Sequence, residues 1–169
     1  KAIVVDSDKD ITGGRNITVT GDITANAIKL GGTGSANTLS DYEEGTFTPT
    51  IHSGLTSANL STATGNYTKV GRLVHFNIDI IINSGTANGD NLQVGNLPFT
   101  ANNDSGNFGM AQIVHNNILS GFTNLYAGII VGNTTHMSFK DGASFIKGNT
   151  SGVDLSNGRR IVIAGTYMA

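Results

Sequence analysis

The sequence contains no cysteine and no tryptophan, and only 13% of its 169 residues are charged. Without cysteine the chain can form no disulfide framework and no thiolate metal site. The charged fraction is low, because an ordinary soluble domain has about 25% charged residues. No run of residues approaches the roughly 18 apolar positions of a membrane-spanning helix. These absences exclude the disulfide-rich, zinc-finger and helical membrane classes.

Neither sign of charge is in large excess, since the formal net charge is −2 and the isoelectric point is about 6.0. This balance gives no electrostatic reason to bind nucleic acid or an anionic membrane. What is abundant instead is glycine, with 23 residues, together with asparagine and threonine, which indicates a β-rich protein with many tight turns. The length fits one domain with an appendage. No signal-peptide pattern follows Lys1, which indicates a piece of a longer chain.

Residues 1–38 are repetitive and have few apolar residues. The triplet Asp-Ile-Thr occurs at Asp10 and again at Asp22. Their apolar side chains stand singly between polar or turn residues, at Ile11, Ile17, Val19, Ile23, Ile28 and Leu30. A buried Ile or Val contributes about 1.5–3 kcal/mol, whereas ordering each backbone residue costs about 1–2 kcal/mol. One chain cannot offset that cost alone, so we predict an elongated oligomeric stalk of β-strands. The alternative is a disordered leader.

Residues 39–169 read as a compact β domain. The stretch from Arg72 to Ile82 alternates strictly, which predicts a half-buried strand with Val74, Phe76, Ile78, Ile80 and Ile82 on its core face. Further predicted strands, separated by turn sequences, are Phe47–Ile51, Asn66–Val70, Leu92–Val94, Phe108–His115, Tyr126–Val131, His136–Lys140, Ser144–Lys147 and Ile161–Met168. This spacing favours an antiparallel β-sandwich of jelly-roll type.

An acidic block, Asp41, Tyr42, Glu43 and Glu44, opens this domain. In an extended segment Glu43 and Glu44 point to opposite faces, so they cannot act as a pair. Asp41 and Glu43 share a face at roughly 6.5–7 Å, a separation that suits a glycosidase, but nothing nearby in the sequence would separate their pKa values. We therefore predict a solvated charged turn at the domain boundary. No nucleophile–base–acid set can be assembled, so we predict a protein without catalytic residues or cofactor.

The sequence also contains no complete local metal-binding motif. Asp6, Asp8 and Asp10 resemble the start of a calcium loop, but Ile11 and Ile17 occupy the positions of its glycine and its bidentate glutamate. A polar strand face is the favoured interpretation. The four histidines form no pair at a spacing of two or four residues; they are His52, His75, His115 and His136. We predict no metal site.

Several aromatic residues lie beside asparagine, serine and glycine, a combination that suits sugar or protein surfaces. The candidate binding residues are Phe108, Phe122, Asn124 and Tyr126. The alternative is that these aromatic side chains fill the core.

Four blocks resemble the C-terminal region of tail-fibre and related fibre proteins of tailed bacteriophages. They are "DYEEGTFTPTI" (Asp41–Ile51), "GNYTKVGRLVHFNIDI" (Gly65–Ile80), "VGNLPF" (Val94–Phe99) and "IAGTYMA" (Ile163–Ala169). The family pattern has tryptophan where this chain has Phe47, and glycine where it has Asn96. The stretch "NITVTGDITANAIKL" is similar to the repetitive shaft sequence of such fibres.

The resemblance implies a homotrimeric virion fibre that is made in the host cytoplasm and acts outside the cell. Residues 1–38 would be an intertwined trimeric shaft, and residues 39–169 the distal head. Ile11, Ile17, Val19, Ile23 and Ile28 would pack on the trimer axis, and Asp41–Glu44 would join shaft to head. The head would attach to a host-surface glycan or outer-membrane protein, and other virion proteins would bind on the N-terminal side.

Other functions stay open at this point. The main alternative is a structural fibre of the head, neck or baseplate that has no direct receptor role. Two further alternatives are a polysaccharide-cleaving enzyme and a non-viral trimeric β head.

Overall fold

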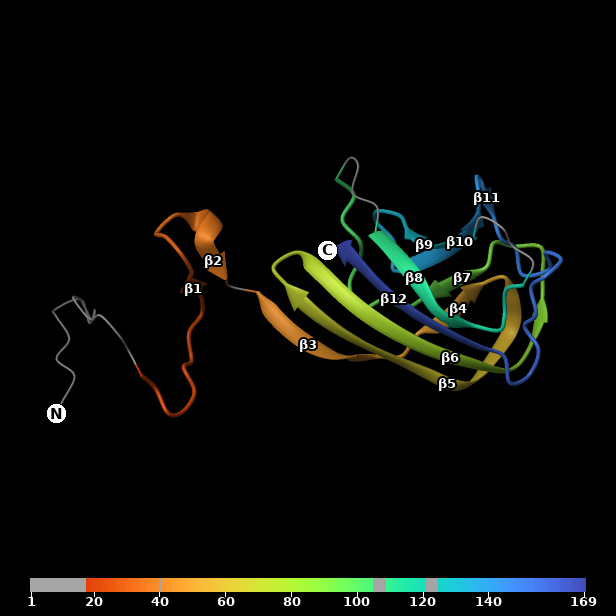
Figure 1. Cartoon of the computed structure of the whole chain (residues 1–169), viewed down its shortest axis with the longest axis horizontal. Helices are drawn as coiled ribbons and strands as arrows, with labels where there is room; N and C mark the ends of the chain where they lie inside the picture. The colour runs from red at the N-terminus through yellow and green to blue at the C-terminus, as the bar shows by residue number, and fades with distance from the viewer. Residues whose placement is uncertain (1–17, 40, 105–108, 121–124) are drawn as a thin grey trace. The chain divides into compact units, whose positions relative to one another are not determined.

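The computed structural model describes residues 18–39, 41–104, 109–120 and 125–169, with the backbone alone at 36 and 125–127 (Figure 1). The chain divides into two compact units, Lys1–Thr38 and Leu39–Ala169. The boundary lies where the repetitive sequence with few apolar residues ends and the sequence of the predicted β domain begins. Within the described residues, no helix has the length and apolar composition to cross a lipid bilayer.

The first unit has little regular structure among its described residues. Strand β1 (Ile28–Lys29) pairs with β2 (Thr38–Leu39), and a 3-10 turn, η1 (Ser35–Asn37), precedes β2. Every described side chain from 18 to 35 is exposed. The exposed fraction is 46% for Val19, 67% for Ile23 and 46% for Ile28, so one copy of the chain does not bury its own apolar residues here. Ile11 and Ile17 lie outside the described residues.

The second unit is one ten-stranded sheet, so the all-β prediction is confirmed. Its strands are β3 (Tyr42–Phe47), β4 (Thr50–Ser53), β5 (Leu55–Val70), β6 (Leu73–Ala87), β7 (Gln93–Gly95), β8 (Gly109–Asn116), β9 (Leu125–Ile130), β10 (His136–Asp141), β11 (Ser144–Phe145) and β12 (Arg160–Met168). The order across the sheet is β3-β5-β6-β12-β8-β9-β10-β7-β4, with β11 on β10.

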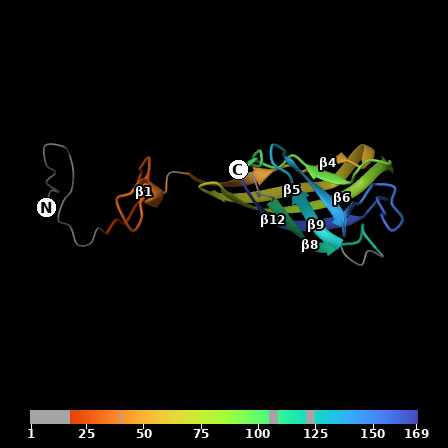
Figure 2. The same ribbon diagram turned by 90° about the horizontal axis from the view of Figure 1, so that it is seen from above.

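The sheet is antiparallel throughout these pairings and curls, so that its two ends approach one another (Figures 1 and 2). Strands β3 and β4 are consecutive in the chain and yet form the two edges of the sheet. What is established is an all-β fold with a curled sheet; the sandwich and the trimeric stalk stay predictions.

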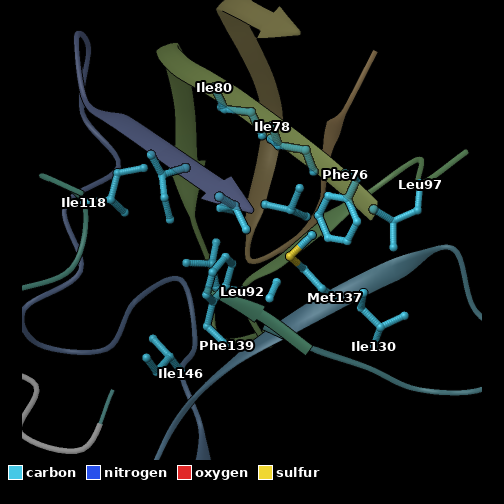
Figure 3. Packing of buried hydrophobic residues seen from close by; sticks show 14 of the residues in the cluster. Phe76, Ile78, Ile80, Leu92, Leu97, Ile118, Ile130, Met137, Phe139 and Ile146 are labelled. Carbon is cyan, nitrogen blue, oxygen red and sulfur yellow. The ribbon is translucent and has the colours of Figure 1, made fainter. Parts of the chain in front are cut away.

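The core lies inside the curl, and β6 supplies its centre. The five residues predicted for the core face of this strand, from Val74 to Ile82, are at most 1% exposed. They meet side chains from the opposite wall, among them Ile130, Met137 and Phe139 (Figure 3). The prediction of a half-buried strand is confirmed, because polar His75 and Asn77 are exposed on the other face.

Several predicted strand ends were wrong, among them the end of β6, which continues to Ala87, and that of β11, which stops at Phe145. The expected strand Phe47–Ile51 is split into β3 and β4, because Pro49 has no N–H to donate to a sheet ladder. Strand β5 begins at Leu55 and not at Asn66, since its polar first half is held in a long hairpin with β6, from Leu55–Ala87 to Val70–Leu73. The acidic block is likewise not a turn: Tyr42, Glu43 and Glu44 lie on the edge strand β3.

Replacement of Ile78 by alanine tests the position of the core. Ile78 is 1% exposed at the centre of β6, so the cavity should lower the free energy of unfolding by about 2–5 kcal/mol. The matched control is Val114→Ala on β8, where the side chain is 66% exposed and a change within about 0.5 kcal/mol is expected. Denaturant unfolding followed by circular dichroism measures both, and equal losses would contradict this core.

Candidate functional site

The four sequence blocks meet in space around the ring and backbone of Phe99. Tyr67 of β5 packs edge-on against Phe99, with ring centroids 5.2 Å apart and planes at 88°. The Nζ atom of Lys69 lies 5.3 Å from the centroid of the same ring. Tyr167 of β12 donates its hydroxyl to the carbonyl of Phe99 at 3.0 Å and accepts the amide N–H of Phe99 at 3.1 Å. Together with Glu43 of β3, these residues are named the motif cluster.

The inner carboxylates of the acidic block bind this cluster. Glu43 accepts a hydrogen bond from the hydroxyl of Tyr67 at 2.8 Å, and Lys69 forms an ion pair with Asp41. The hydrogen bond to Glu43 is the main reason why the pKa of Tyr67 is raised. Both contacts link β3, or the residue before it, to β5. Each of the two carboxylates thus has its own partner on β5.

Glu44 points to the opposite face of β3, as the sequence predicted. Its carboxylate accepts a hydrogen bond from the hydroxyl of Tyr42 at 3.1 Å, and this bond raises the pKa of Tyr42. Residues two apart on a strand share a face, so Tyr42 and Glu44 lie together on one face of β3 and Glu43, which is also exposed, lies on the other. Glu43 and Glu44 therefore have separate partners on opposite faces of β3.

Glycines make room for the aromatic side chains of the motif cluster. Across β3 and β5, Gly45 lies opposite Tyr67 and Phe47 lies opposite Gly65. A Cβ on Gly65 would lie 2.5 Å from Cζ of Phe47, and one on Gly45 would lie 2.9 Å from the hydroxyl oxygen of Tyr67. Each strand thus places an aromatic ring over a glycine of the other, and this holds the two rings 6.5 Å apart.

Tyr167 is the most deeply placed polar group of the motif cluster. It is 3% exposed, and burial raises its pKa to about 12. Its ring also packs against Phe76 at the centre of the core, at 5.9 Å. The last strand of the chain is therefore tied both to the core and to the loop that carries Phe99.

The outer face of the sheet has two neighbouring hollows that share Met110. The first, of about 450 Å³, lies over Ala164 and Gly165 of β12, between His75 of β6 and Gln112 of β8. It forms because the central strand has small residues where its neighbours have long ones. Its lining is mixed, with polar side chains around an apolar floor.

The second hollow, of about 380 Å³, is lined by Gly109, Met110, Ile129, Val131, Lys140 and Phe145. It is apolar apart from Lys140, whose Nζ lies 5.0 Å from the ring centroid of Phe145. The exposed fractions are 68% for Met110, 42% for Val131 and 44% for Phe145. An apolar surface beside one cation can bind an apolar group that carries a nearby negative charge.

Of the predicted binding residues, Phe108, Phe122 and Asn124 lie outside the described residues. Tyr126 is placed by its backbone only, on β9 opposite Lys140. Phe108 directly precedes Gly109 in the sequence, and the prediction of these four residues as a binding site stays untested. The sequence reading missed Met110, Val131 and Phe145 as surface residues. Alternation along β8 could have revealed Met110, since Ala111 is buried and Gln112 is exposed.

Two histidines that are remote in sequence stack on the sheet. His52 of β4 and His136 of β10 flank Gly95 of β7, and their rings are 4.4 Å apart and nearly parallel, at 9°. A Cβ on Gly95 would lie 2.8 Å from Cβ of His52, so glycine allows the close approach. Among the described residues, no group of three or more His, Cys, Asp or Glu side chains could hold a metal ion.

Comparison with known proteins finds no match: no family model, no curated protein and no solved structure is similar to this chain. The functional interpretation therefore depends on two things that can be checked directly. One is the set of short blocks that resemble fibre proteins, and the other is the geometry in which the described residues place them.

Substitution of Tyr167 by phenylalanine tests the motif cluster. The ring stays in place, but the amide and carbonyl of Phe99 lose their partner at a buried position, so the free energy of unfolding should fall by about 1–3 kcal/mol. In the control Tyr42→Phe, an exposed hydrogen bond is lost and a change within about 0.5 kcal/mol is expected. Denaturant titration compares them; a larger loss in the control would contradict the assignment.

The histidine stack predicts a pH dependence of stability. Burial and the charge of His52 lower the pKa of His136 below its ordinary value of 6.5. As the pH falls through 6.5, the unfolded chain takes up this proton before the folded chain does, so stability should decrease until the lower folded pKa is passed. His136→Phe keeps a flat ring without the titration and should flatten the slope of stability just below pH 6.5. Identical slopes for the wild type and the variant would show that the histidine stack does not determine the pH dependence of stability.

Proposed function

We propose that this chain is the distal part of a homotrimeric tailed-bacteriophage fibre, which attaches the virion to the host surface without catalysis. The observation that carries the proposal is the motif cluster. Blocks that are far apart in the sequence, each resembling a part of the same fibre proteins, contribute Glu43, Tyr67, Phe99 and Tyr167 to one contact set. Unrelated chance matches would have no reason to converge.

The exposure of the first unit supports an assembly of several copies. Val19, Ile23, Ile28 and Leu30 are between 46% and 67% exposed in one chain. Since a lone two-stranded ribbon is marginal in water, identical copies that wrap a common axis supply the missing apolar contacts. On this proposal Val19, Ile23 and Ile28 face the axis.

The second hollow is the proposed contact with the host. Its apolar walls and its single cation, Lys140, suit a surface glycan with an apolar substituent and an acidic group, or an exposed segment of an outer-membrane protein. Binding in one such open hollow is weak. Three copies on one fibre increase the avidity through their high effective concentration.

Cell binding by the purified full chain tests this function. The double variant Phe145→Asp with Lys140→Glu removes the apolar wall and reverses the charge, so it should bind cells of the susceptible host at least 10-fold more weakly, as measured by flow cytometry of labelled protein. Val114→Asp, exposed on the same sheet face but outside the hollow, is the control and should bind as the wild type does.

Two results would overturn the proposal. One is wild-type protein that neither binds susceptible cells nor competes with the phage for adsorption. The other is a fibre that maps away from the tail tip on labelled virions, with infection intact in the presence of antibody against it, which would favour the structural fibre instead.

A further inference from the structure

A row of apolar side chains crosses the outer face of the sheet at the end where β3 begins. Tyr42 lies opposite Val70, Val70 opposite Leu73, and Leu73 opposite Met168. Residues directly opposite in antiparallel strands share a face, so the four side chains form one line over β3, β5, β6 and β12. This line is named the apolar row. It spans about 14 Å across the strands.

Three of the four side chains of the apolar row are exposed in the single chain, and Met168 is half-buried. The exposed fractions are 59% for Tyr42, 47% for Val70 and 48% for Leu73, while Val74 and Tyr167, which point inward beside the row, are at most 3% exposed. The row exposes on the order of a few hundred Å² of apolar surface, less than the ~800 Å² that each partner contributes to a standard interface, so polar residues around the row must supply the rest of the contact. An exposed apolar patch of this size with a polar rim often marks an interaction site.

The edges of the row have the polar character of an interface rim. Arg72, at the tip of the hairpin between Val70 and Leu73, forms an ion pair with Asp104 at 3.3 Å, and both side chains are more than half exposed. Two residues further along each strand, on the same outer face, the next line of side chains is polar. It consists of Glu44, Thr68 and His75. An apolar centre with an exposed rim of both charge signs is self-complementary, because a second copy offers the opposite charge for each.

The short stretch of chain between the first unit and Tyr42 identifies what covers the apolar row. Tyr42 is the fourth residue after Thr38, the last residue of the first unit, and four extended residues span at most about 14 Å. If copies associate through their first units, as the proposed function requires, their Tyr42 residues are held within that reach of the assembly. The closest apolar surface available to the row is then the same row on another copy, at high effective concentration.

We propose that copies of this chain pack on one another through the apolar row Tyr42–Val70–Leu73–Met168, which makes this end of the second unit a head-to-head interface. The inference rests on the proposed function, because the fibre assembly brings the rows together. It also gives Tyr42, in the acidic block, two roles: its hydroxyl is held by Glu44, and its ring covers the neighbouring copy.

Multi-angle light scattering of the full chain over a range of concentrations tests the interface. Leu73→Asp places a charge at the centre of the row and should raise the concentration for half-assembly at least 10-fold. Val70→Asp is the second variant and should act in the same direction. Val114→Asp is the matched control, since it makes the same change on the same face outside the row, and it should assemble as the wild type does.

Hydroxyl-radical footprinting provides a readout that does not depend on whether a variant folds. In the assembled wild type, Tyr42 and Leu73 should be oxidised several-fold more slowly than exposed Val114 after correction for intrinsic reactivity. Without this protection the row is open, and the inference is overturned whatever the variants do.

The outcomes separate this inference from the proposed function. A wild type that is a single chain at every concentration overturns both. A wild type that assembles, with Leu73→Asp and Val114→Asp assembling equally well, overturns the apolar row alone and leaves the fibre function standing.

Discussion

The whole second unit depends on the burial of one face of β6. Its inward side chains, from Val74 to Ile82, are almost fully buried, and the strand pairs along its length with β5 on one side and β12 on the other. A slip of one residue in either register would turn every inward side chain to the outside, so burial fixes both neighbours at once. The curl of the sheet then brings β7, β9 and β10 across to close the core.

The same alternation decides where the candidate sites lie. On the inner face, beyond the last buried aliphatic residues, it places the motif cluster around Phe99, with Tyr167 linking core and loop. On the outer face it leaves the apolar row and the two hollows, because residues that point away from the core have no second layer of protein over them. The buried core and the exposed candidate sites are thus consequences of one period-two pattern. The stacked pair of His52 and His136 does not belong to this pattern and lies near the β4 edge of the sheet.

Much of the fold could be predicted where local pattern and final environment agree. The segment Arg72–Ile82 was recognisable because its alternation is strict and its one-sided burial is real. Strand β5 was only half recognised, since the Thr-, Ser- and Asn-rich stretch from Leu55 has no apolar period and owes its conformation to pairing with β6. Pro49 could have signalled the break between β3 and β4, because a residue without an N–H interrupts a ladder.

By itself, the sequence determined the all-β class, the core face of β6 and the opposite orientation of Glu43 and Glu44. These follow from covalent geometry, which turns successive side chains of a strand to opposite faces. Only the tertiary structure decided that Tyr67, Phe99 and Tyr167 meet, that His52 stacks on His136, and that Met110 and Phe145 line one hollow. These contacts join distant strands, and their register is set by the free energy of the complete curled sheet and not by any local pattern.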